Sequence, residues 1–165
     1  MRSTLSVKLA AAWLVFGLVF AGSAHAQNNK QIISGTYFED QASSDAVSSG
    51  IATLTFTQTP TNKFVNVTHV ACDIFVNSSQ VLTMLRLEVG TSLGVSDLGR
   101  SYPIKNTPNT PEVLANGKVY SVVTDQLFFK IGPGRFPSIF IAAPQFSGAV
   151  SITPNCFITG TLSDN

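Results

Sequence analysis

The chain has 165 residues, with 10 Lys or Arg against 9 Asp or Glu, and a formal net charge of +1. Its basic residues are scattered along the sequence, so the positive patch that a nucleic acid or an anionic membrane requires is absent. With two cysteines, no C-x-x-C pair and a single histidine after residue 26, the chain also lacks the ligand set of a structural zinc site. The length suits a single small domain.

Residues 1–26 predict a helical secretory signal peptide. Two basic residues precede an apolar run that ends near Gly22, and small residues close the segment at Ala26. The apolar run is shorter than the roughly 20 residues that a membrane-spanning helix needs, so cleavage after Ala26 is favoured over a permanent anchor. We therefore expect an exported protein, periplasmic or secreted, whose single domain comprises residues 27–165 and carries no integral membrane span.

From residue 27 onward, short β-branched and aromatic runs alternate with turn residues. The run IATLTFT at 51–57 alternates strictly, with apolar side chains on one face and threonines on the other, which predicts a half-buried strand. Longer runs at 64–76 and 81–89 are separated by NSSQ, and we expect these two strands to form a hairpin.

Later segments continue the strand pattern. The dipeptide Asn116-Gly117 predicts a two-residue hairpin turn, because both central positions of such a turn need positive φ. The segment 90–112, rich in Gly, Pro and polar residues, predicts a long connection or a set of edge strands. About eight to ten strands in one domain of this size predict an all-β fold, a single antiparallel β-sandwich that is Ig-like or jelly-roll-like.

The two cysteines lie in predicted strands. Strand parity places Cys72 on the same face as Ile74, and Cys156 on the same face as Ile158, so both thiols point toward the predicted core. Export to an oxidising compartment and an even cysteine count predict a disulfide between Cys72 and Cys156, with two buried free thiols as the alternative. Its role would be structural.

A candidate binding loop lies at GPGRFP, residues 132–137. The glycines and proline force a bend that leaves Arg135 and Phe136 near its tip, and an exposed Arg–aromatic pair is a common binding anchor. Tyr102, which precedes a proline in the long connection, is a second candidate contact. The alternative is a structural hairpin loop in which Phe136 packs back onto the sheet.

Catalytic chemistry has little support in the sequence. His69 is the one histidine after residue 26, and the G-x-S-x-G motif of serine hydrolases is absent. We therefore predict no catalytic residues, no metal and no cofactor, and we interpret the acidic cluster at Glu39 and Asp40 as a solvated loop. A hydrolase would need carboxylates such as Glu39, Asp40 or Glu88 to converge in the fold.

These observations favour a non-enzymatic exported module with a structural, envelope-associated or ligand-binding role. Its partner would be an unknown protein or glycan in the cell envelope or outside the cell, and nucleic acid is excluded. One alternative is a carboxylate-dependent hydrolase that acts on glycans. Another is a self-assembling surface subunit that pairs through an open sheet edge.

Overall fold

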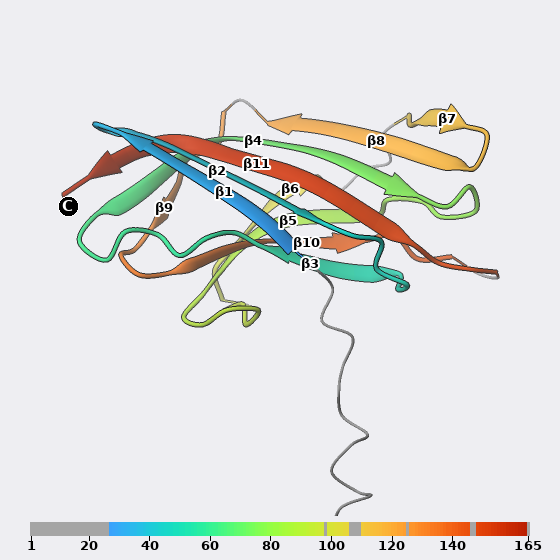
Figure 1. Cartoon of the computed structure of the whole chain (residues 1–165), viewed down its shortest axis with the longest axis horizontal. Coiled ribbons are helices and arrows are strands. Elements are labelled where there is room, and N and C mark those ends of the chain that lie inside the picture. Colours follow the sequence, from blue (N-terminus) through green and yellow to red (C-terminus); the bar gives the residue numbers. More distant parts are fainter. Residues whose placement is uncertain (1–26, 98, 106–109, 125, 146–147, 165) are drawn as a thin grey trace, which may run out of the picture.

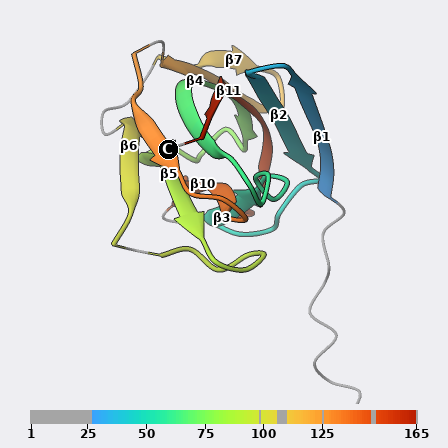
Figure 2. The same cartoon turned by 90° about the vertical axis from the view of Figure 1, so that its left-hand side faces the viewer.

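The computed structural model describes residues 27–97, 99–105, 110–124, 126–145 and 148–164. The predicted signal peptide, residues 1–26, lies outside the described residues. Within them, every regular element is a strand, and the strands form two antiparallel sheets packed together (Figures 1 and 2). The prediction of an all-β sandwich is confirmed.

The described part of the chain contains eleven strands, slightly more than the sequence predicts. They are β1 (Gln27–Ser34), β2 (Tyr37–Ser44), β3 (Ile51–Thr55), β4 (Phe64–Val76), β5 (Met84–Gly90), β6 (Ser101–Lys105), β7 (Glu112–Leu114), β8 (Gly117–Thr124), β9 (Phe129–Ile131), β10 (Phe136–Ala142) and β11 (Ile152–Ser163). The segment between β5 and β7 thus holds the edge strand β6, in agreement with the prediction of edge strands there.

The larger sheet has seven strands in the order β1-β2-β11-β4-β8-β7, with β9 pairing to β4, and the smaller has the order β3-β10-β5-β6. The core lies between the two sheets, where alternate residues of facing strands bury their apolar side chains. Fully buried members include Phe38, Leu54, Ile74, Leu87, Ile139 and Ile158. Figure 2 shows the two layers nearly end on.

The predicted hairpin between residues 64–76 and 81–89 is wrong. These segments form β4 and β5, which belong to different sheets, so the NSSQ turn carries the chain across the sandwich. Gln80 stabilises this crossing: its buried amide donates to the carbonyl of Ala143 at 2.6 Å and accepts from the amide of Ser151 at 2.8 Å. A turn signal indicates that the chain reverses, and does not indicate which sheet the next strand joins.

The predicted hairpin around residue 116 exists as β7 and β8, but its turn is one residue earlier. Leu114 opposes Gly117 in the register, so the loop consists of Ala115 and Asn116, and Gly117 is not among the residues with positive φ. Gly117 is required for space instead, because a Cβ there would lie 2.4 Å from the Phe75 ring.

Cys72 and Cys156 are directly opposed on the neighbouring strands β4 and β11. Their sulfur atoms are 2.11 Å apart, the separation of a disulfide, and both residues are buried in the core. The bridge therefore joins the last strand to the centre of the seven-stranded sheet, as the parity of the two cysteines predicts. Among the residues that the structure describes, no helix is long and apolar enough to cross a membrane.

Candidate functional site

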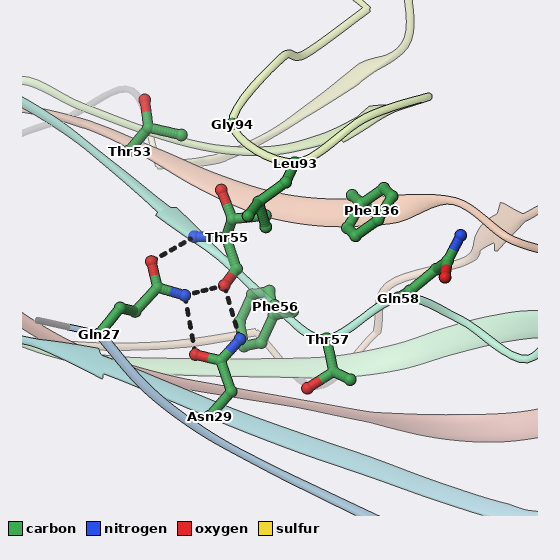
Figure 3. A pocket seen from close by; sticks show the side chains of 10 residues that line it. All are labelled: Gln27, Asn29, Thr53, Thr55, Phe56, Thr57, Gln58, Leu93, Gly94 and Phe136. Carbon is green, nitrogen blue, oxygen red and sulfur yellow. Dashed lines mark hydrogen bonds between the residues drawn. The ribbon is translucent and has the colours of Figure 1, made fainter. Parts of the chain in front are cut away.

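An open groove with a volume of about 750 Å³ follows the edge of β3 (Figure 3). This volume lies within the range of small-molecule sites. The lining comes from β1, from β3 and the residues after it, from the β5–β6 connection and from the start of β10. Its members are Gln27, Asn29, Thr53, Thr55, Phe56, Thr57, Gln58, Leu93, Gly94 and Phe136.

One wall of the groove is built by amide side chains on β1. Gln27 and Asn29 are two residues apart, so they point to the same side of the strand, toward β3. Gln27 donates to the carbonyl of Thr55 and to Asn29 Oδ1, and Asn29 Nδ2 donates to the same Thr55 carbonyl at 2.9 Å. Gln27 Oε1 accepts from the Thr55 amide at 3.3 Å. These bonds fix the positions of both amides.

The opposite wall is formed by the β5–β6 connection. Asp97 N donates to the carbonyl of Val89 at 2.7 Å, which folds the connection back against the end of β5. Gly90 permits this close approach, because a Cβ there would lie 1.6 Å from the carbonyl oxygen of Val95. The fold leaves Leu93 68% exposed at the groove, where Figure 3 shows it above Thr55.

The loop at 132–137 is not a hairpin loop. It connects β9, in the seven-stranded sheet, to β10, in the four-stranded sheet. The buried hydroxyl of Thr59 accepts from the amide of Arg135 at 2.9 Å and donates to the carbonyl of Gly132 at 3.0 Å. Thr59 N in turn donates to the Arg135 carbonyl at 2.8 Å, and Gly134 adopts a φ of +65°. The loop is therefore held firmly against residues 58–60.

The three residues of the predicted binding site separate in the structure. Phe136 is half-buried and lines the groove, whereas the exposed Arg135 lines a smaller pocket. Tyr102, on β6, lies opposite Leu87 of β5 and packs against the core, so it belongs to neither site. Sequence reasoning also missed the wall formed by Gln27 and Asn29, because QNNKQ is polar throughout and has no alternation that would indicate a strand face.

The carboxylates do not converge. Asp40, interpreted from the sequence as part of a solvated loop, lies on β2 and is fully buried, so that interpretation is wrong. Its Oδ2 accepts from the Thr57 amide at 2.8 Å, and burial raises the pKa of the Asp40 carboxyl. Glu39 lies on the opposite face of β2 and accepts from the Tyr37 hydroxyl at 2.5 Å.

Glu88 belongs to the other sheet and is fully buried. It lies on the outer face of the four-stranded sheet, alternating with the core residues Leu85 and Leu87, and forms an ion pair with Arg86 at 3.1 Å. The three carboxylates named as candidates for hydrolysis therefore occupy three different sheet faces. Among the described residues, no group of three or more His, Cys, Asp or Glu could hold a metal ion.

A second hollow, of about 560 Å³, lies on the outer face of the seven-stranded sheet. Ala71 forms its floor because this small residue lies between the larger Phe157 and Val123 in the register. His69 borders the hollow, with its ring 5.4 Å from that of Phe157. The hollow is more enclosed than the groove at β3, and its lining includes the polar side chains of Gln41, Asp73 and Asn155.

Comparisons with protein-family models, with curated proteins and with solved structures each find no match to this chain. The fold and the groove define the class: a β-sandwich with a disulfide within one sheet and, along the edge of the other, an open groove lined by both polar and apolar side chains.

Proposed function

We propose that this protein is an exported, non-enzymatic binding module that holds an oligosaccharide in the groove along β3. The observation that carries the proposal is the composition of the groove, in which amides and hydroxyls face the apolar side chains of Leu93 and Phe136. A sugar ring presents the complementary surface, since its hydroxyls exchange hydrogen bonds with amides and threonines and its C–H faces pack on apolar groups.

The absence of acids from the groove supports binding without hydrolysis. Glycosidases use two carboxyl groups about 5–10 Å apart on either side of the scissile bond. None of the ten residues that line the groove is Asp or Glu. The separation of Glu39, Asp40 and Glu88 on three faces points the same way.

Export is part of the proposal. The predicted cleavage after Ala26 and the Cys72–Cys156 bridge both suit an oxidising compartment. An exported β-sandwich encounters the glycans of the cell envelope or those outside the cell, which are the partners that we propose. Cleavage would also make Gln27, a groove residue, the first residue of the mature chain.

The test is binding of the exported, disulfide-linked protein to a panel of immobilised oligosaccharides. We expect Leu93→Ala and Phe136→Ala each to weaken retention about ten-fold, the effect of losing a contact of about 1.4 kcal/mol. Phe157→Ala is the matched control, because Phe157 is a partly exposed phenylalanine on the outer face of the other sheet.

Loss of binding can be distinguished from loss of folding. Leu93 is 68% exposed, so its truncation can alter binding without disturbing the core, which a melting curve of each variant verifies. The proposal fails if no oligosaccharide is retained. It also fails if Phe157→Ala reduces retention while the two groove variants do not, since the hollow over Ala71 would then be the site.

A further inference from the structure

Close to the groove lies a smaller pocket with a volume of about 80 Å³. It is lined by Val89, Gly90, Thr91, Asp97, Arg100 and Arg135. The two pockets share their structural supports: the β5–β6 connection lines both, and the consecutive residues Arg135 and Phe136 contribute one to each. The groove therefore neighbours a pocket that is lined by two arginines.

The fold holds the side chain of Arg100 and the backbone of Arg135 in place. Arg100 Nη2 donates to the carbonyl of Lys130 at 2.6 Å, and its guanidinium lies 5.3 Å from the centre of the Phe129 ring. A guanidinium has five N–H donors, so this single bond leaves others for a ligand. The backbone of Arg135 is fixed by its two hydrogen bonds to Thr59. Arg100 therefore needs little further ordering before it binds an anion, whereas the exposed side chain of Arg135 is ordered on binding.

The charge of the pocket is positive in spite of one acid. Asp97 also lines it, and Asp97 Oδ1 accepts from the amide of Gly99 at 3.0 Å. Among the described residues, no ion pair joins Asp97 to Arg100 or Arg135. Two guanidiniums and one carboxylate leave a net charge of +1 in a space of about 80 Å³, which is the room of two or three waters or of one carboxylate or sulfate group.

The geometry points to an anion subsite that makes the protein selective for acidic oligosaccharides. This inference rests on the proposed function: the sugar ring lies in the groove, and its carboxylate or sulfate enters the pocket between Arg100 and Arg135. Arginine is suited to this role, because its planar fork donates two parallel hydrogen bonds to such a group. The mature chain has one more acid than base, so the attraction is local to this pocket and not a property of the whole surface.

The experiment compares one oligosaccharide in two forms. An oligogalacturonate carries free carboxylates, whereas its methyl ester has the same backbone without charge. A sulfated neutral oligosaccharide forms a third arm, which distinguishes a carboxylate site from a sulfate site. We expect the preferred acidic form to bind the exported protein at least about ten-fold more tightly than the neutral form. That preference decreases between about 0.01 M and about 1 M salt.

Three variants test the residues. Arg135→Gln removes an exposed guanidinium and should abolish most of the preference while leaving binding of the methyl ester unchanged. Asp97→Asn should increase the preference, since it removes the opposing charge from the pocket. Lys30→Gln, on the exposed edge strand β1, changes the net charge by the same amount as Arg135→Gln and is expected to have no effect.

Each result decides a different point. If acidic and neutral forms bind equally, or if Arg135→Gln weakens both to the same degree, the anion subsite is overturned while the saccharide groove stands. If Lys30→Gln matches Arg135→Gln, the preference arises from overall charge and the subsite is again overturned. If no form binds, the proposed function itself fails.

Discussion

The side chain of Gln27 binds both backbone polar groups of Thr55: Nε2 donates to the carbonyl and Oε1 accepts from the amide at 3.3 Å. Thr55 lies on β3, an edge strand of the four-stranded sheet, whose outward backbone groups would otherwise be open to another chain. A side-chain amide thus replaces a neighbouring strand. Because Gln27 belongs to β1 of the other sheet, the same contact joins the two layers at the groove.

Gln27→Ala is predicted to destabilise the fold and to expose the edge of β3. The loss of hydrogen bonds to Thr55 should lower the free energy of unfolding by about 0.5–1.5 kcal/mol per bond. The uncovered edge should also increase self-association at high protein concentration. Urea denaturation measures the first effect, and sedimentation velocity measures the second.

Gln41→Ala is the matched control for this variant. Gln41 also holds another amide, donating to Asn155 Oδ1 at 3.1 Å, but it does so on the exposed outer face of the seven-stranded sheet. That variant should remain monodisperse and lose less stability. Equal association of the two variants would show that the amide of Gln27 does not protect the edge.

Asp40→Asn is predicted to change how stability depends on pH. Burial raises the pKa of Asp40 in the folded state above its ordinary value of 3.8, so between the two pKa values the folded state binds more protons than the unfolded state. The contribution of Asp40 to the free energy of unfolding is therefore fully present below pH 3.8. It is lost as the pH rises through the folded-state pKa. The Asn variant cannot ionise, so it should lose this decrease and be at least as stable as wild type at neutral pH.

Asp40→Ala separates charge from hydrogen bonding. Alanine leaves the Thr57 amide, which in wild type donates to Asp40 Oδ2 at 2.8 Å, without its acceptor. Because neither variant ionises at this position, the Ala variant should be less stable than the Asn variant by about 1–3 kcal/mol at every pH. Chemical denaturation of both variants at several pH values measures these effects. An Asn variant whose stability falls with rising pH as steeply as that of wild type would contradict the assignment to Asp40.

Period-two alternation predicts which face a residue occupies better than it predicts what lies opposite that face. The apolar row of IATLTFT is buried as expected, but the threonine row does not simply face solvent: Thr55 is buried and Thr53 lines the groove. The segments that cover this row are β1 and the β5–β6 connection. Whether they lie beside β3 depends on the order of the strands in the two sheets. A local pattern contains no information on strand order.

The error at Asp40 has a different origin. Its parity with Phe38 and Ala42 indicates an inward side chain, yet its acidic character and its neighbour Glu39 favoured a solvated loop. The two hydrogen bonds from Thr57 that permit its burial come from 17 residues away, across the sandwich. Similarly, the sequence locates the GPGRFP bend, but the hydrogen bonds of this bend to Thr59 span more than 70 residues.

The Cys72–Cys156 bridge is predicted to be a major source of stability. It closes a loop of 84 residues, for which the chain-entropy model gives about 4–5 kcal/mol as an upper value. Replacing both cysteines by alanine should lower the free energy of unfolding by about 2–5 kcal/mol without changing the far-ultraviolet circular dichroism spectrum. The intact mass of the exported wild type should correspond to residues 27–165 less two hydrogens. This role would be contradicted by two titratable thiols in the denatured, unreduced protein, or by a double variant as stable as wild type. In either case the last strand, β11, would be held only by its hydrogen-bonded pairing with β2 and β4.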